Sequence, residues 1–214
     1  MRVAVLASGG GTNLQALLDA CQRDALARVA IVISNTPKAG ALDRARTSGV
    51  ETAVLDDPAD GPALVALLGA HRIDLVVLAG YLKLIPPEVV AAYGMRMINI
   101  HPALLPAFGG KGMYGHRVHE AVLASGATVS GCTIHLVDAE YDRGQIVAQW
   151  PVPVAPDDTP ESLAARVLEV EHQLLPAVVL AAAQAGGIAR LLPSGAAFSV
   201  DAPDRPVAAQ MTRT

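Results

Sequence analysis

The sequence predicts an α/β protein with an open, mostly parallel, Rossmann-like β-sheet that carries helices on both faces. Its 214 residues are 52% hydrophobic but 3% aromatic, which favours a buried parallel sheet over a sandwich of aromatic-rich strands. In the N-terminal half, short apolar runs alternate with segments of helical periodicity, and this alternation implies right-handed crossovers between parallel strands. In the C-terminal half, two strand-like runs follow one another and predict an antiparallel addition to the sheet.

The N-terminal half is expected to contain five strands separated mostly by helices. Strands are predicted at residues 1–7, 29–34, 50–55, 74–79 and 97–101. Helices are predicted at 14–21, in a short segment that follows Gly40 and ends at Arg46, and at 63–68. Ligands of parallel sheets bind beyond the carboxyl ends of the strands. The segments Ser8–Asn13, Gly80–Lys83 and Asn99–His101 all follow or end such strands, so we expect them to line one cleft.

The C-terminal half is expected to add a helix, two strands and a long final helix. The helix covers residues 116–125, and the strands cover 128–138 and 145–154. Thr159 followed by Pro160 is typical of a helix N-cap and the first helical position. A short strand through Leu192 would close a single domain of residues 1–192, followed by a flexible, proline-containing tail of residues 193–214.

Charge and cysteine content limit the classes of partner. The formal net charge of -4 gives no general attraction to nucleic acid. Cys21 and Cys132 form neither a metal-binding spacing nor a disulfide framework, which suits a reducing cytoplasm. The apolar run 1–7 is too short for a signal peptide or a membrane span. We expect a cytoplasmic monomer or homodimer that binds small molecules, with no nucleic acid, membrane or metal.

Asn99 and His101 are the candidate reactive pair. In an extended strand, these two side chains point the same way, whereas Ile98 and Ile100 point into the opposite layer. An amide that can hold an oxyanion, beside a group that moves protons near neutral pH, suits the transfer of an acyl or formyl group. The alternative is that Asn99 caps a turn and His101 is a buried structural histidine.

The glycine-rich segment Ser8–Asn13 lies between a predicted strand and a predicted helix. The free N–H groups and positive dipole end of that helix, together with the Thr12 hydroxyl, suit a phosphate. The segment is neither a Walker motif nor the Gly-x-Gly-x-x-Gly of a dinucleotide fold. The alternative is a tight turn in which Asn13 is the N-cap.

Several polar residues of the C-terminal half could reach the same cleft. In the turn 139–144, the acids could be solvated, or one carboxylate could lie against His101. The glycine-rich loop 107–115 could order over a ligand or be a plain surface loop. His119 could be a ligand contact or an ordinary surface or packing residue, whereas Glu171 on its own is expected to be a helix-surface charge.

In combination, several motifs resemble those of a known family. They are Gly9–Gln15, Leu78–Lys83, Asn99–Pro106, Gly131–His135 and Tyr141–Gly144. Up to about residue 190 the chain resembles the folate-dependent glycinamide ribonucleotide formyltransferases of purine biosynthesis. The resemblance implies the formyltransferase fold and transfer of a formyl group from 10-formyltetrahydrofolate to the amine of glycinamide ribonucleotide, without a metal.

The resemblance also implies a role for individual residues. Asn99, His101 and Asp142 would be catalytic: Asn99 and His101 would stabilise the developing oxyanion, and Asp142 would hold His101. The ribonucleotide would contact Gly10, Gly11, Thr12, Asn13, Gly80, Leu82, His119 and Glu171. The folate would contact Lys83, Leu84, Ile85, Val90, Val137, Glu140 and Tyr141, and Thr133 and His135 would support the site.

Two departures and three alternatives accompany this resemblance. Lys83 stands where many members have arginine and lacks the planar two-pronged donor, and the loop 108–115 is longer and richer in glycine than usual. The Asn-x-His-Pro motif alone also marks formyltetrahydrofolate deformylases and methionyl-tRNA formyltransferases. The first usually carry an N-terminal regulatory domain, and the second need a C-terminal domain and a basic surface. A non-catalytic nucleotide-binding module is the third alternative.

Overall fold

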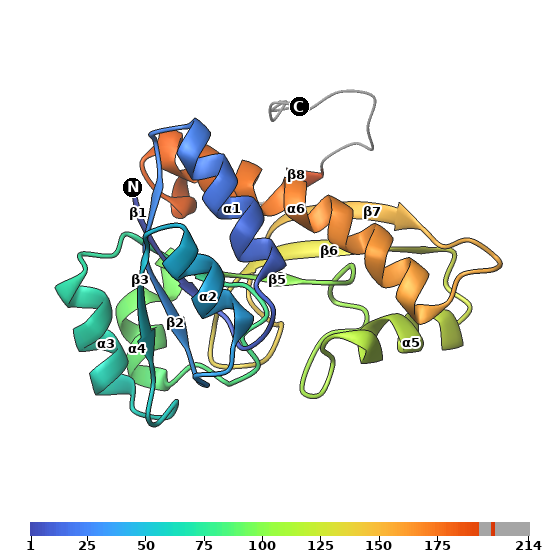
Figure 1. Cartoon of the computed structure of the whole chain (residues 1–214). Helices are drawn as coiled ribbons and strands as arrows, with labels where there is room; N and C mark the ends of the chain where they lie inside the picture. The colour runs from blue at the N-terminus through green and yellow to red at the C-terminus, as the bar shows by residue number, and fades with distance from the viewer. Residues whose placement is uncertain (193–197, 200–214) are drawn as a thin grey trace.

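A single β-sheet runs through the computed structural model, which describes residues 1–192 and 198–199 (Figure 1). Its eight strands have the order β3-β2-β1-β4-β5-β6-β7-β8. The parallel part consists of β1 (Arg2–Leu6), β2 (Arg28–Ser34), β3 (Glu51–Val54), β4 (Leu75–Leu78) and β5 (Met97–His101). The strand order reverses direction between β1 and β4, as in other doubly wound sheets. The predicted Rossmann-like parallel sheet is therefore confirmed.

The C-terminal half adds the predicted antiparallel strands. The strand β6 (Val129–Leu136) runs antiparallel to β5, and β7 (Ile146–Pro153) runs antiparallel to β6. The two-residue strand β8 (Phe198–Ser199) then pairs in parallel with β7. The rest of the expected tail, 193–197 and 200–214, lies outside the described residues.

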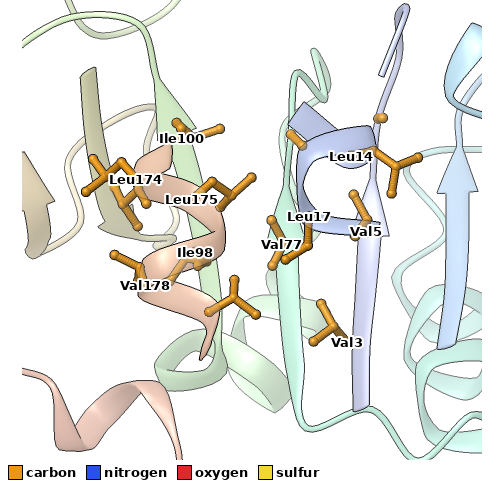
Figure 2. Packing of buried hydrophobic residues seen from close by; sticks show 14 of the residues in the cluster. Val3, Val5, Leu14, Leu17, Val77, Ile98, Ile100, Leu174, Leu175 and Val178 are labelled. Carbon is orange, nitrogen blue, oxygen red and sulfur yellow. The ribbon is translucent and has the colours of Figure 1, made fainter. Parts of the chain in front are cut away.

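Helices cover both faces of the sheet, because the central strands are continuous apolar runs whose successive side chains point to opposite faces. One face carries α1 (Thr12–Arg23), α2 (Gly40–Thr47), α5 (His116–Ala124) and α6 (Pro160–Ala185). Figure 2 shows Leu14 and Leu17 of α1 beside the sheet residues Val5 and Val77. It also shows Leu174 and Leu175 of α6 beside Ile98 and Ile100 of β5. These contacts fix α1 and α6 over the centre of the sheet.

The opposite face carries α3 (Gly61–Ala70) and α4 (Pro87–Tyr93). Leu64 and Leu68 of α3 and Val89 of α4 pack with the alternate residues of the strands, such as Leu6 and Val76. The sequence analysis did not anticipate α4. Its apolar residues are few, and Pro87 at its first position is equally common in loops.

One local expectation and one of the alternatives were wrong. Residues Ile188–Arg190 form the 3₁₀-helix η2 instead of a strand, because local hydrogen bonds to the Gly187 and Ile188 carbonyls satisfy the backbone while Ile188 is buried. Asn13 is not an N-cap. Gly11 takes that position with φ 75°, and Asn13 is the second residue of α1.

The longest helix, α6, begins as predicted. The Thr159 hydroxyl accepts a hydrogen bond from the Ser162 N–H at 3.2 Å, and the Ser162 hydroxyl accepts one from the Thr159 N–H at 2.9 Å. This capping box fixes the start of the helix that carries Glu171. In the described part of the chain, no helix has both the length and the apolar character needed to span a bilayer.

Candidate active site

A cavity of about 650 Å³ opens beyond the carboxyl ends of β4 and β5. It lies where ligands of open α/β sheets usually bind. The residues after β4, the end of β5, the turn after β6 and one side of α6 all contribute to its wall. The predicted site residues in the wall are Asn13, Gly80, Leu82, Lys83, Leu84, Ile85, Asn99, His101, His119, His135, Val137, Glu140, Tyr141, Asp142 and Glu171.

Five predicted site residues lie outside this wall. Gly10, Gly11 and Thr12 form the turn before Asn13, which is the residue of that segment that reaches the cavity. Val90 packs partly buried in the hydrophobic layer beneath α4, because the helix turns it toward the sheet. Thr133 is fully buried behind the wall.

Asn99 belongs to a compact hydrogen-bond network. The His135 ring donates from Nδ1 to the Leu136 carbonyl at 2.7 Å, because a carbonyl can only accept. In the neutral ring, Nε2 therefore accepts from the Asn99 amide nitrogen at 3.0 Å. The second N–H of Asn99 points to Asp142 Oδ1 at 3.4 Å, a long hydrogen bond. This second N–H is the one available to an oxygen bound in the cavity.

His101 is held between a carbonyl and a carboxylate. Its Nε2 donates to the Phe108 carbonyl at 2.9 Å, and its Nδ1 lies 3.6 Å from Asp142 Oδ2. The neutral ring thus presents the lone pair of Nδ1 toward Asp142 and the cavity. Burial lowers the pKa of His101, although the charge of Asp142 and the Phe108 carbonyl oppose that effect. The neutral, proton-accepting form is therefore favoured near pH 7.

Asp142 is brought to this position by the turn after β6. The Leu136 N–H donates to the Gln145 carbonyl at 2.8 Å and closes the turn. Gly144 approaches the Leu136 carbonyl so closely that a Cβ atom would overlap it. Burial would raise the pKa of Asp142, but three neighbours lower it overall: His135, whose Nε2 lies 3.5 Å from Oδ1, the nearby His101, and the Gly110 N–H, which donates at 2.9 Å. Asp142 is therefore an anion.

Thr133 supports the site from behind. Its hydroxyl donates to the Ala103 carbonyl at 2.6 Å and accepts from the Leu105 N–H at 3.0 Å. Gln149 on β7 donates to the same hydroxyl at 3.0 Å and to the Leu105 carbonyl at 2.9 Å. These bonds fix the proline-bounded loop after His101. The sequence analysis missed Gln149 because nothing in its strand distinguishes it from an exposed polar residue.

The loop 108–115 forms one wall of the cavity. Residues Gly110 to Gly115 line it, followed by His116, Arg117 and His119 of α5. The part of the wall on α6, where Ala164, Ala165 and Leu168 join Glu171, was also not predicted. Helical spacing would bring these residues to one face, but their small apolar side chains give no sign of a ligand.

Glu171 and His119 are buried titratable groups in the wall. Glu171 is 6% exposed and accepts a hydrogen bond from the Asn13 amide at 2.7 Å. Burial raises the pKa of Glu171 to about 7, although the Asn13 bond opposes the shift. Burial, helped by the charges of His116 and His101, lowers the pKa of His119 to about 4. Both residues are therefore able to be uncharged near neutral pH.

Glu171→Gln is expected to stabilise the empty protein above neutral pH. The unfolded carboxyl loses its proton near pH 4.5 and the folded one at about 7, so folding becomes less favourable as the pH rises through this range. At pH 8 the raised pKa lowers the free energy of unfolding of the wild type by about 3 kcal/mol relative to Glu171→Gln. This difference between the two proteins should vanish below about pH 4.5. Urea unfolding at about pH 4 and about pH 8 measures it.

Exposed Glu169 on the same helix provides the control. Glu169→Gln should leave the free energy of unfolding unchanged at both pH values. Equal stability of wild type and Glu171→Gln at the higher pH would contradict a buried, destabilising carboxylate at position 171.

The fold that carries this site is shared with proteins of a known family. Residues 1–179 match the family described as Formyl transferase, and the chain belongs to that family. Several relatives within it are named phosphoribosylglycinamide formyltransferase. The Haemophilus influenzae protein is 38% identical over 190 residues, covering 83% of this chain and 85% of its own. The chloroplastic protein of Arabidopsis thaliana is 48% identical over 186 residues, covering 83% of this chain.

Solved structures agree with these relatives. The phosphoribosylglycinamide formyltransferase of Anaplasma phagocytophilum superposes with a TM-score of 0.79 at 39% identity, covering 86% of each chain. Glycinamide ribonucleotide transformylase 1 of Symbiobacterium toebii gives 0.78 at 42% identity, covering 86% of this chain and 88% of its own. The resemblance seen in the sequence motifs is therefore confirmed.

The plant relatives are longer than the matched region. The chain spans 64% of the Arabidopsis thaliana protein and 59% of that of Vigna unguiculata. Both of these relatives are chloroplastic, so a cytoplasmic location stays a prediction for this chain.

Proposed function

We propose that this protein transfers the formyl group of 10-formyltetrahydrofolate to the amine of glycinamide ribonucleotide. The observation that carries the proposal is the cluster of partly buried Asn99 and Asp142 with buried His101, facing one cavity. It joins an amide donor, a neutral imidazole and an anionic carboxylate, which together suit attack by an amine on a formyl carbon. The names of the relatives support glycinamide ribonucleotide as the acceptor.

The acceptor is assigned to the side of the cavity formed by α1 and α6. The glycine-rich turn before Asn13 opens α1, whose first turn contains no acidic residue, and a helix N-terminus favours a phosphate. Glu171 can accept hydrogen bonds from ribose hydroxyls or from the amine. Binding to such donors favours the ionised carboxylate.

The folate is assigned to the side formed by the residues after β4 and β6. Leu84, Ile85 and Val137 give this wall an apolar surface for a pterin ring. The side chains of Leu82 and Leu84 are 48% and 46% exposed. Lys83 is exposed beside them and can pair with a carboxylate of the folate as a point charge.

The chemical step follows from the hydrogen bonds. The amine lone pair attacks the formyl carbon, and the carbonyl oxygen becomes negative. The second N–H of Asn99, which has only the long bond to Asp142, donates to this oxygen, while Nδ1 of His101 accepts the proton that leaves the attacking nitrogen. The bond to the folate nitrogen then breaks, and that nitrogen takes up a proton. Asp142 stabilises the imidazolium formed at His101.

The rival functions differ in the acceptor. A deformylase would deliver the formyl group to water, a tRNA formyltransferase would require an aminoacyl-tRNA, and a binding module would consume nothing. Absorbance-monitored turnover of 10-formyltetrahydrofolate, with and without glycinamide ribonucleotide, separates them. The proposal expects turnover that depends on the ribonucleotide. Turnover without it would contradict the proposal, and so would its absence under both conditions.

A further inference from the structure

We infer that Arg44 is a positioning residue for the glycine-rich segment 8–13, which it holds with its N–H groups directed at a phosphate. The inference rests on the proposed function and adds a residue that no motif indicated. Arg44 lies on α2, outside the cavity wall. It acts through the backbone of the segment and does not itself touch the substrate.

Two hydrogen bonds join α2 to consecutive carbonyls of the segment. Arg44 Nε donates to the Gly10 carbonyl at 2.8 Å, and the Ala41 N–H donates to the Gly9 carbonyl at 3.1 Å. Arg44 Nη1 also donates to Gln15 Oε1 on α1 at 3.4 Å. One guanidinium thus bridges the glycine-rich segment and the first turns of the helix that follows it.

These bonds determine where the N–H groups point. In a planar trans peptide, the C=O and the N–H of the same unit point in opposite directions. With the Gly9 and Gly10 carbonyls turned toward α2, the N–H groups of Gly10 and Gly11 are turned away from it. Within residues 1–192 and 198–199, these two N–H groups donate to no protein acceptor. They are therefore available to an anion at the start of α1.

Close packing prevents the segment from shifting along α2. Gly11 has φ 75°, and a Cβ atom at this position would lie 2.7 Å from Ala41 Cα. Gly40 also packs against Gly10, since its Cβ would lie 3.4 Å from the Gly10 backbone. Figure 1 shows α2 beside α1, and contacts between the two helices confirm this. The orientation of the segment is thus set by α2, and Arg44 supplies its charged hydrogen bond.

The test compares ligands that differ only in the phosphate. Arg44→Met is expected to weaken binding of glycinamide ribonucleotide about tenfold, because a hydrogen bond from a charged group is lost. Binding of the phosphate-free glycinamide riboside and the kcat at saturating ribonucleotide should not change. Calorimetric titration of each ligand into the full chain measures the two affinities.

Three further variants make the result decisive. Arg46→Met removes the same charge from the same helix, where Arg46 pairs with exposed Asp43, and should change neither affinity. Arg44→Lys keeps the charge without the fixed fork and should lose part of the affinity for the ribonucleotide. Gln15→Ala removes one hydrogen-bond partner of Arg44 and should cause a smaller loss of affinity for the ribonucleotide. This variant still tests the inference if Arg44→Met does not fold.

The outcomes separate the inference from the proposed function. Equal loss for both ligands in Arg44→Met would show a general structural role, and unchanged affinity would show no role; either overturns the inference while leaving the proposed function intact. If wild type binds the ribonucleotide no more tightly than the riboside, the segment is not a phosphate site, and the proposed acceptor site itself fails.

Discussion

Asp142→Asn is expected to lower kcat about a hundredfold or more while leaving the protein folded, because general-base assistance is worth this much. The substitution preserves the size of the side chain and an acceptor for the Gly110 N–H. It removes the charge that stabilises imidazolium at His101, and that charge is one cause that raises the pKa of His101. The pKa of His101 should therefore be lower in the variant, and the residual kcat should begin to fall, as the pH is lowered, at a lower pH than in wild type.

The measurement is a pH profile of kcat together with an unfolding curve. The pKa of Asp142 is lower in the folded protein than in the unfolded chain. The Asp142 charge therefore stabilises the folded protein at pH values above the pKa of the unfolded chain, and this stabilisation is lost as the pH falls through the pKa of the folded protein. At neutral pH the variant should be about 1 kcal/mol less stable. Asp157→Asn, which removes an exposed carboxylate, is the control. Full turnover in a folded Asp142→Asn protein would contradict the role of Asp142.

Replacement of Asn99 is expected to have the second large effect. Asn99→Ala removes the N–H assigned to the developing oxyanion and should lower kcat about 10²- to 10³-fold, the usual effect of losing one such donor. Asn99→Asp should be slower still. Its carboxylate would stand where the amide nitrogen now lies 3.4 Å from Asp142 Oδ1, and two negative charges there oppose a third on the substrate oxygen.

Asn99→Ala and Asn99→Asp serve as controls for each other. Because neighbouring carboxylates raise the pKa of one another, Asn99→Asp should recover part of its activity as the pH falls, whereas Asn99→Ala should not. Affinity for the ribonucleotide should change little in Asn99→Ala. Equal activity of wild type and Asn99→Ala would remove Asn99 from the chemistry.

Strand periodicity predicted which side chains of β5 face the cavity. Ile98 and Ile100 are buried in the layer beneath α1 and α6, while Asn99 and His101 face the cavity, because side chains alternate along a strand. The same rule predicted that Cys132 and Ile134 would face the core and that His135 would face the site. The rule that ligands lie beyond the carboxyl ends of the strands brought separate motifs to one cavity.

Other parts could not be predicted, since they depend on backbone groups or on contacts distant in sequence. The partner of His101 Nε2 is the Phe108 carbonyl, and every residue type has a carbonyl. Gln149 and Arg44 act through hydrogen bonds to backbone oxygens of remote loops. The helix α4 is short and begins among prolines, and η2 has too few residues to show a period.

The most direct test of the proposed function is to follow the formyl carbon. The protein would be mixed with isotopically labelled 10-formyltetrahydrofolate and glycinamide ribonucleotide, and the products separated and identified by mass spectrometry. Direct transfer predicts that the label appears on the amine of the ribonucleotide, with one labelled product for each tetrahydrofolate released. Label recovered as formate, with the ribonucleotide unchanged, would contradict the account.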